Sequence, residues 1–528
     1  MGIQLTGLLH CHQPFRDLFE TAYIPLKVRY NGRVHDRALI PNLYVSNKDE
    51  KLVDYNQKIT QECYEPSAAK GIYSRLPFNM SPSLLKDLWI RAPHVYNNII
   101  ESEKRSFDRF GGHSNAIGQA SPNHIIMPLA NAKDKLLHAL WSIEEYEKHY
   151  GRFPEGMWLP EAAVDKKTLS VLADVGIKYV VLAPRQAKKV KPLFSSEHEW
   201  KSVEGGHIDI SKPYKIYFED TKKEIAVFFY DKSFSGDLGF PNKQTEWIYH
   251  NENNFTARWL NIWGELKHFA VDGETFGHHH KGKVDLLANS LNLIEKNPDI
   301  KLTNYGLFLE ENPPKWDVEI IDYSSWSCEH GLVRWGKEFT HEGDHCREGS
   351  IGSQWRVEMR KAFDRLALDL DRIFLKHAGQ YFHDPQLATE NYGSVTSGKE
   401  TFYEFFDKYG KSGLSDRKLE EAYKLIEMQK LKAHMFTSCA WFHDYIGRLE
   451  PLANFLSAYS AIKIAKHFEP RAKLEERFLH DPDKEKLNHD HHKHYEKAKI
   501  DMKAVYQDAK NVMEEYERTL QSVGSLAA

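Results

Sequence analysis

The sequence has few cysteines, no long apolar run and no excess of charge of one sign. Five cysteines stand far apart in 528 residues without a CxxC pair, which fits a reducing cytoplasm better than a disulfide framework. No apolar stretch approaches the roughly 20 residues of a membrane span, and the N-terminus lacks the basic region of a signal peptide. The formal net charge is −4. We therefore expect neither nucleic acid nor a membrane as a partner.

Seven short apolar or β-branched runs occur in the first 272 residues, with helical patterns between several of them. Most runs end at polar side chains, and alternation of strands with helices predicts a parallel α/β sheet. Seven units favour a (β/α)7 barrel, with an open doubly wound sheet as the alternative. The runs are Gln4–Leu9, Ile72–Phe78, Asn115–Gln119, Gly156–Leu159, Lys178–Leu182, Ile225–Tyr230 and His268–Val271.

The pattern changes to helix alone after about residue 350. Apolar residues from Met359 to Ile373, and from Leu452 to Ile462, recur every three or four positions, which predicts packed amphipathic helices. We expect a barrel over residues 1–310 and an all-helical domain over 311–528 that contributes to the active site. The charged segment Asp481–Ala528 contains HDHHKHYEK and is interpreted as an exposed helix.

Two histidines, His10 and His12, end the first run in the motif HCHQPF. Residues i and i+2 of a strand share a face, so these two imidazoles can together bind a metal or a polar substrate. A strand end with internally satisfied histidines is the alternative interpretation.

Two carboxylates follow apolar runs and are the main candidates for chemistry. Glu161 stands in WLPEAAV and Asp272 in FAVDGETFGHHH. Parallel barrels place their chemistry at the C-terminal ends of strands, and two carboxylates suffice to cleave a glycosidic bond. Glu274 lies close enough in sequence to tune Asp272. A metal site with the three histidines is less favoured, because consecutive histidines in a turn cannot all face one ion.

Together these motifs resemble glycoside hydrolase family 57. HCHQPF, SNAIGQASPNHIIMPLAN, GMWLPEAAV, FAVDGETFGHHH and SWSCEHGLVRW stand in the order of the five family signatures. The resemblance implies a seven-unit barrel followed by a helical domain, and retaining chemistry on α-glucans without a metal or cofactor. It assigns the nucleophile to Glu161 and the acid/base to Asp272. The second and fifth motifs depart from those of the amylase and transferase members, which leaves substrate specificity open.

Further side chains are expected to contact a glucan or maltooligosaccharide substrate. They mix imidazole, indole, amide, carboxylate and guanidinium groups, which suits stacking and hydrogen bonding to sugars. Two other functions stay open: a metal-dependent carbohydrate hydrolase of the deacetylase or mannosidase kind, and a catalytically silent glucan-binding protein. The expected contacts are His10, His12, Gln13, Trp158, Glu274, His279, Trp326, His330, Arg334 and Trp441.

Overall fold

The computed structural model describes residues 3–14, 43–45, 52–193, 199–337, 355–443, 446–480, 501–515 and 517–518. These residues form two compact units. The barrel unit comprises the described residues up to Gln13, those between Leu43 and Pro122, and Ala130–Glu329. The helical unit comprises Pro14, Asn123–Leu129 and the described residues from His330 onward.

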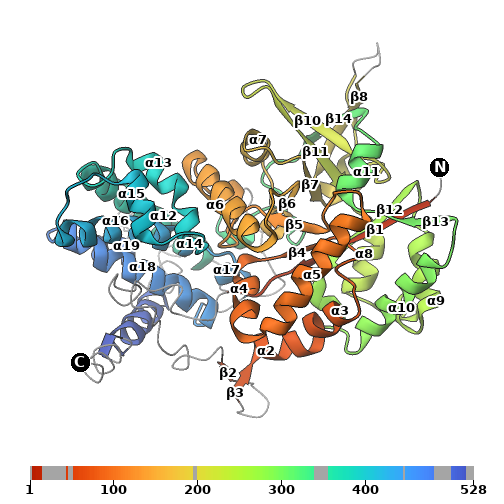
Figure 1. Ribbon diagram of the computed structural model, residues 1–528, viewed down its shortest axis with the longest axis horizontal. Coiled ribbons are helices and arrows are strands. Elements are labelled where there is room, and N and C mark those ends of the chain that lie inside the picture. The colour runs from red at the N-terminus through yellow and green to blue at the C-terminus, as the bar shows by residue number, and fades with distance from the viewer. Residues whose placement is uncertain are drawn as a thin grey trace, which may run out of the picture. The chain divides into compact units, whose positions relative to one another are not determined.

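The barrel unit is built on a run of seven parallel strands in the described part of the chain (Figure 1). Each predicted run corresponds to one strand. Only the second is badly misplaced, because Ile72–Leu76 forms hydrogen-bonded turns and extended backbone begins at Phe78. In spatial order the strands are β12 (Leu266–Asp272), β1 (Ile3–Cys11), β4 (Phe78–Met80), β5 (Ala116–Gln119), β6 (Gly156–Trp158), β7 (Tyr179–Leu182) and β11 (Lys223–Phe229).

The strand order identifies a barrel. It follows the chain from β1 to β11 in one direction, and the last strand, β12, pairs with the first. A doubly wound sheet instead reverses direction at a switch point. The Asp231 amide donates to the His268 carbonyl at 2.9 Å, which links the end of β11 to β12 and brings the two edges of the run together. The predicted (β/α)7 barrel is confirmed.

Side chains of β1 alternate between the helices and the barrel interior. Leu5, Leu9 and Cys11 are buried in one apolar cluster together with Phe269 and Val271 of β12 and residues of the surrounding helices. The intervening position His10 therefore points inward, because successive side chains of a strand point to opposite faces. Because the odd-numbered side chains of β1 pack against the helices, only its even-numbered side chains can contribute to a site inside the barrel.

Additional strands extend the sheet beyond β11. The strand β14 follows the last barrel helix and pairs with both β10 and β8, so the barrel unit continues to Glu329. These strands are β10 (Tyr214–Phe218), β14 (Trp316–Ile320), β8 (Ala187–Pro192) and β9 (Lys201–Ser202); β13 (Ile300–Leu302) pairs with β1, and β2 (Leu43–Val45) pairs with β3 (Leu52–Asp54).

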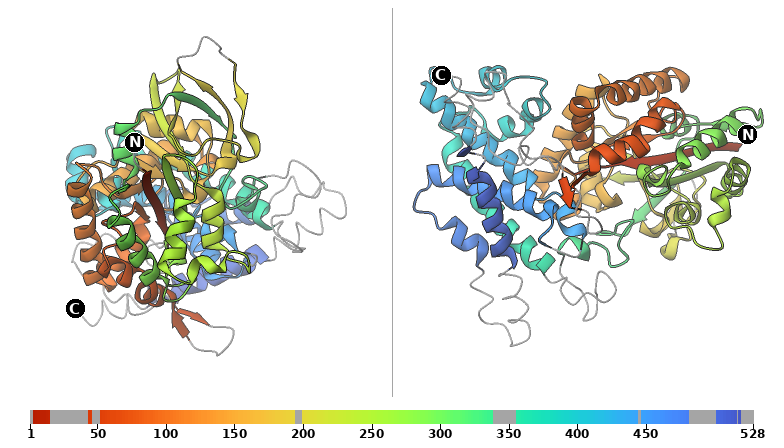
Figure 2. Two further views of the ribbon diagram at one scale, coloured as in Figure 1. Left: turned by 90° about the vertical axis from the view of Figure 1, so that its right-hand side faces the viewer. Right: turned by 90° about the horizontal axis from the view of Figure 1, so that it is seen from below.

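Helices cover the barrel strands, with the orange group and the green group on different sides of β1 (Figure 2). Several begin at a side chain that accepts a backbone N–H, such as Ser81, Asn131 and Asp165, as helix N-termini require. The main helices are α2 (Tyr55–Ile59), α3 (Glu65–Ala69), α4 (Pro82–Arg91), α5 (Pro93–Arg109), α6 (Ala132–Tyr150), α7 (Lys166–Asp174), α8 (Lys232–Gly239), α9 (Glu252–Leu260), α10 (Lys283–Glu295) and α11 (Tyr305–Glu311).

The helical unit packs around Phe363. Its ring lies 5.2 Å from the rings of Phe455 and Phe478 and 5.9 Å from that of Trp441. The stripe predicted from Met359 to Ile373 is buried, as expected for a helix bundle. The helices are α12 (Trp355–Ala378), α13 (Pro385–Asn391), α14 (Gly393–Thr396), α15 (Phe402–Tyr409), α16 (Asp416–His434), α17 (Cys439–Phe442), α18 (Leu449–Phe468) and α19 (Leu474–Leu479).

The C-terminal segment differs from the predicted exposed helix. Residues 501–515 are helical, but Met502, Val505, Tyr506, Ala509 and Met513 are buried at helical spacing, so one face packs. The histidine-rich HDHHKHYEK lies outside the described residues. Among the described helices, none has the length and apolar character needed to cross a membrane.

Candidate active site

Polar side chains meet in one row at the C-terminal ends of three adjacent strands. In the sheet register His10 of β1 stands opposite Asp272 of β12 on one side and opposite Asn79 of β4 on the other. The row exists because β12 pairs directly with β1, although more than 250 residues separate the two strands along the chain.

Asn79 orients the ring of His10. Its Nδ2 donates to the carbonyls of Ile117 and Gly118, so its Oδ1 faces His10 Nδ1 at 2.8 Å as an acceptor. This network assigns the proton of the neutral ring to Nδ1 and leaves Nε2 as the acceptor. Burial lowers the pKa of His10 to about 4, so the ring is neutral near pH 7.

Aromatic rings line the same end of the barrel. The ring centroid of Trp158 lies 5.0 Å from that of His10 and 4.9 Å from that of Trp326. Tyr230, which follows β11, meets Trp326 edge to face at 6.3 Å. Trp158 is fully buried, and its Nε1 has no hydrogen-bond partner among the described residues. A buried indole N–H usually has an acceptor, so Trp158 is an exception among the described residues.

Glu161 occupies a strained turn after β6. Its φ is +59°, and that of the following residue, Ala162, is +45°. Left-handed backbone costs a non-glycine residue about 1–2 kcal/mol and is enriched at functional sites. Two neighbours hold the turn, because the Trp326 amide donates to the Glu161 carbonyl at 3.0 Å and the Ser327 hydroxyl donates to its carboxylate. The turn thus gives the carboxylate a defined position.

Asp272 ends β12 and is flanked by two other carboxylates. Burial within the protein raises its pKa well above the usual range, and the negative charges of Glu274 and then Glu161 raise it further. The residue still has contact with solvent. A carboxyl group that keeps its proton near neutral pH and exchanges it with its surroundings can act as a general acid.

Glu274 is buried and hydrogen-bonded through one oxygen. Its Oε1 accepts from the Tyr64 hydroxyl, from the His12 amide at 3.1 Å and from Gln13 Nε2 at 3.4 Å. Burial raises the pKa of Glu274, and these donors oppose that rise. The carboxylate therefore holds the turn after β12 against the end of β1.

The three consecutive histidines point to separate partners. His278 Nδ1 lies 2.6 Å from Glu62, and His280 Nε2 lies 3.1 Å from the Leu238 carbonyl. His279 is exposed, and its ring is tilted against that of His278 at a centroid distance of 5.5 Å. The arrangement agrees with the argument that these side chains do not converge on one ion.

Three of the expected substrate contacts belong to the helical unit. His330 is exposed, and Arg334 lies 4.9 Å over the ring of Phe442. Trp441 is fully buried and donates from Nε1 to the Arg356 carbonyl at 3.0 Å, so it has no surface for stacking on a sugar. Trp441 therefore belongs to the core of the helical unit, and we do not retain it as a substrate contact.

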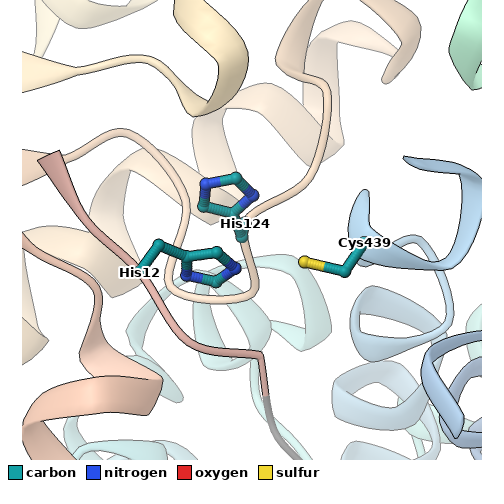
Figure 3. A group of neighbouring side chains, drawn as sticks. All are labelled: His12, His124 and Cys439. Carbon is teal, nitrogen blue, oxygen red and sulfur yellow. The ribbon is translucent and has the colours of Figure 1, made fainter. Parts of the chain in front are cut away.

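The helical unit also brings together His124 and Cys439, which the sequence analysis did not select (Figure 3). Cys439 Sγ and a His124 ring nitrogen lie within 4.8 Å of each other. His124 Nδ1 also contacts the Ser438 hydroxyl at 2.8 Å.

Other residues of the barrel site carried only a weak sequence signal. Asn79 directly follows the second predicted run, and that position alone assigned it no role. Ser327 lies in the aromatic stretch around Trp326. Tyr64 lies inside a helical segment with no pattern pointing to chemistry, so only the structure reveals it.

The chain belongs to glycosyl hydrolase family 57, whose model matches residues 9–319. Membership makes it a glycoside hydrolase or transglycosylase. A second model, a domain of unknown function named DUF3536, matches residues 352–511. No curated protein has a matching sequence.

Solved structures share the fold at low sequence identity. An exo-type maltose-forming amylase from Pyrococcus sp. ST04 has a TM-score of 0.64 at 16% identity, covering 91% of this chain and 82% of the amylase. A GH57-type branching enzyme from Pyrococcus horikoshii has a TM-score of 0.54 at 16% identity, with 96% and 97% covered. A GH57 branching enzyme from Thermococcus kodakaraensis has a TM-score of 0.50 at 14% identity, with 96% of both chains covered.

Proposed function

We propose that this protein cleaves or transfers α-glucosidic bonds of glucans by a retaining double displacement. Glu161 is the proposed nucleophile and Asp272 the proposed acid/base. The observation that carries the proposal is the placement of two carboxyl groups close enough for the charge of Glu161 to raise the pKa of Asp272, with Glu161 in the turn after β6 and Asp272 at the end of β12. The activities in the names of the family 57 structures above support α-glucan as the substrate class.

In the first step a Glu161 oxygen attacks the anomeric carbon while the glycosidic C–O bond breaks. Asp272 transfers its proton to the departing oxygen, and a glycosyl ester on Glu161 results. In the second step the Asp272 carboxylate removes a proton from water or from a sugar hydroxyl. The resulting oxygen attacks the same carbon, and Glu161 leaves as a carboxylate. The configuration at the anomeric carbon is inverted in each step, so the product keeps the configuration of the substrate.

His10 and Trp326 are proposed substrate contacts, and Trp158 supports them. His10 Nε2 is an acceptor for a sugar hydroxyl, and the fully buried Trp158 ring stacks on the His10 ring at 5.0 Å. Trp326 is partly exposed and offers a ring for stacking. Gln13 and Glu274 hydrogen-bond to each other, so we assign them a supporting part. His12, His279, His330 and Arg334 remain candidate contacts.

The test is incubation with maltooligosaccharides and amylose, followed by chromatography of the products. Shorter sugars alone indicate hydrolysis, and longer or branched products indicate transfer. Glu161→Gln is expected to lower kcat at least about 1,000-fold, or roughly 4 kcal/mol, because an amide is no nucleophile. Glu204→Gln, at an exposed glutamate, is the matched control. A Glu161→Gln variant that keeps more than about a tenth of wild-type kcat would contradict the assignment.

A reducing, cytoplasmic location is proposed as well. In the described part of the chain, Cys11 and Cys63 are buried free thiols. Cell fractionation of the native host tests this, and recovery in an oxidising compartment would contradict it.

A further inference from the structure

Tyr64 ends a π-helical turn beside the candidate active site. The turn Thr60–Tyr64 lies between α2 and α3 without a break in the helical backbone. Such turns are rare and occur often at functional sites, because the extra residue changes where the following side chains point. The Tyr64 side chain is fully buried, and its hydroxyl donates to Oε1 of Glu274.

The contact closes a small network around Glu274. Gln13 Nε2 donates to the Tyr64 hydroxyl at 3.3 Å as well as to Glu274 at 3.4 Å. The Gln13 carbonyl in turn accepts from the Ser83 hydroxyl at 2.6 Å. Tyr64 is therefore fixed by its own partners, and its proton has a defined acceptor.

We propose that Tyr64 is a positioning residue, which keeps Glu274 as a fixed negative charge beside Asp272 so that Asp272 retains the proton that it donates. This inference rests on the acid/base role proposed above for Asp272. Donation to a carboxylate stabilises its charged form, and a neighbouring negative charge disfavours ionisation of a second carboxyl. Tyr64 acts through Glu274 and does not touch the reacting atoms.

The surroundings of the pair support this electrostatic argument. The charges acting on Asp272 come from Glu161 and Glu274, and both raise its pKa. Cysteine thiols and tyrosine hydroxyls, which are neutral near pH 7, lie close as well, and burial raises the pKa of each. The other titratable groups facing the pair are His10, Cys11 and His12 from the end of β1, Cys63 and Tyr64 from the π-helical turn, Tyr73 and Tyr230.

Tyr64→Phe tests the inference, because it removes the hydroxyl and keeps the ring. Without its donor Glu274 takes up a proton more readily, its negative charge weakens, and Asp272 loses its proton at lower pH. The alkaline limb of the pH profile of kcat/KM is expected to move down by about one pH unit. Glu274→Gln removes the charge outright and is expected to move the limb at least as far in the same direction.

The double variant separates this mechanism from a structural role. If Tyr64 acts through Glu274, then adding Tyr64→Phe to Glu274→Gln moves the limb no further. Tyr73→Phe is the control, since Tyr73 is an equally buried tyrosine whose hydroxyl is not bonded to Glu274 in the contacts described. Its limb is expected to stay at the wild-type pH. Melting temperatures of all variants report on folding.

An unshifted limb in Tyr64→Phe, with only a lower melting temperature or a uniform loss of rate, would overturn the inference. Asp272→Asn distinguishes this from failure of the proposed function. If Asp272→Asn is inactive and the alkaline limb of Tyr64→Phe is unshifted, only the role assigned to Tyr64 is wrong. If Asp272→Asn retains wild-type activity, the acid/base assignment falls and this inference falls with it.

Discussion

At the scale of single residues, the candidate site holds groups in protonation states that water would not favour. Burial lowers the pKa of His10 to about 4, and the pKa of Asp272 is raised. Glu161 adds left-handed backbone at a non-glycine position. Each of these features opposes folding, and each persists because neighbouring strands hold it in place.

His268 makes the stability of the barrel depend on pH. Its Nε2 lies 2.9 Å from the Ile210 carbonyl and its Nδ1 lies 3.1 Å from the Tyr305 hydroxyl, so the folded state holds a neutral ring. The unfolded chain binds a proton below about pH 6.5 and the folded chain only below about pH 4. Stability contributed by this residue is therefore present above pH 6.5 and is lost as the pH falls between these two values.

The expected loss from His268 alone is about 2 kcal/mol in the free energy of unfolding between pH 7.5 and pH 5. Urea unfolding of the wild type and of His268→Gln at both pH values measures it. The variant is less stable at pH 7.5 and is expected to lose about 2 kcal/mol less than the wild type on acidification. Equal losses in the two proteins would show that His268 is not held neutral.

At the scale of elements, the pairing of β1 with β12 positions the site. Gly7 of β1 stands opposite Phe269 of β12 in the register, and a Cβ at position 7 would come within 2.4 Å of that ring. The absence of a side chain here lets the two strands meet closely enough for His10 to lie opposite Asp272.

Gly7→Ala is expected to destabilise the fold by about 1–3 kcal/mol, because Phe269 is buried and has no free space to enter. The backbone at Gly7 is not left-handed, so the effect is purely steric. Gly236→Ala in α8 is the control, because a Cβ there meets nothing within 4 Å. Thermal unfolding measures both variants. Equal stability of Gly7→Ala and the wild type would show that the strands tolerate a wider spacing.

The strands could be predicted from the sequence because the signal that ends each strand lies close to it along the chain. An apolar run followed by a polar residue is visible within about ten positions, and six of the seven runs coincide with strands, whereas the second reaches β4 only at Phe78. The second run was misplaced because Ile72, Tyr73 and Leu76 are apolar and fully buried yet lie in turns, and buried turns resemble strands in composition. Trp441 shows the same ambiguity, since an indole in a helix core and one at a binding site have the same sequence pattern.

At the scale of the whole molecule, the enzyme is expected to work without a metal. The double displacement needs two carboxylates and no Lewis acid. Dialysis against EDTA is therefore expected to leave kcat/KM for maltooligosaccharides unchanged. Loss of activity restored by a divalent ion would favour the metal-dependent hydrolase. His124→Ala and Cys439→Ser would then show whether the pair in the helical unit takes part.

The sequence by itself predicted the architecture and singled out two candidate carboxylates, because strand periodicity, helical spacing and a charge after an apolar run are local signals. The contacts that set their chemistry were decided by the tertiary structure alone. His10 and Asn79 are 69 positions apart, Glu161 and Ser327 are 166 apart, and Tyr64 and Glu274 are 210 apart. No local pattern encodes such pairs, since their side chains meet only when the parallel strands assemble into the barrel.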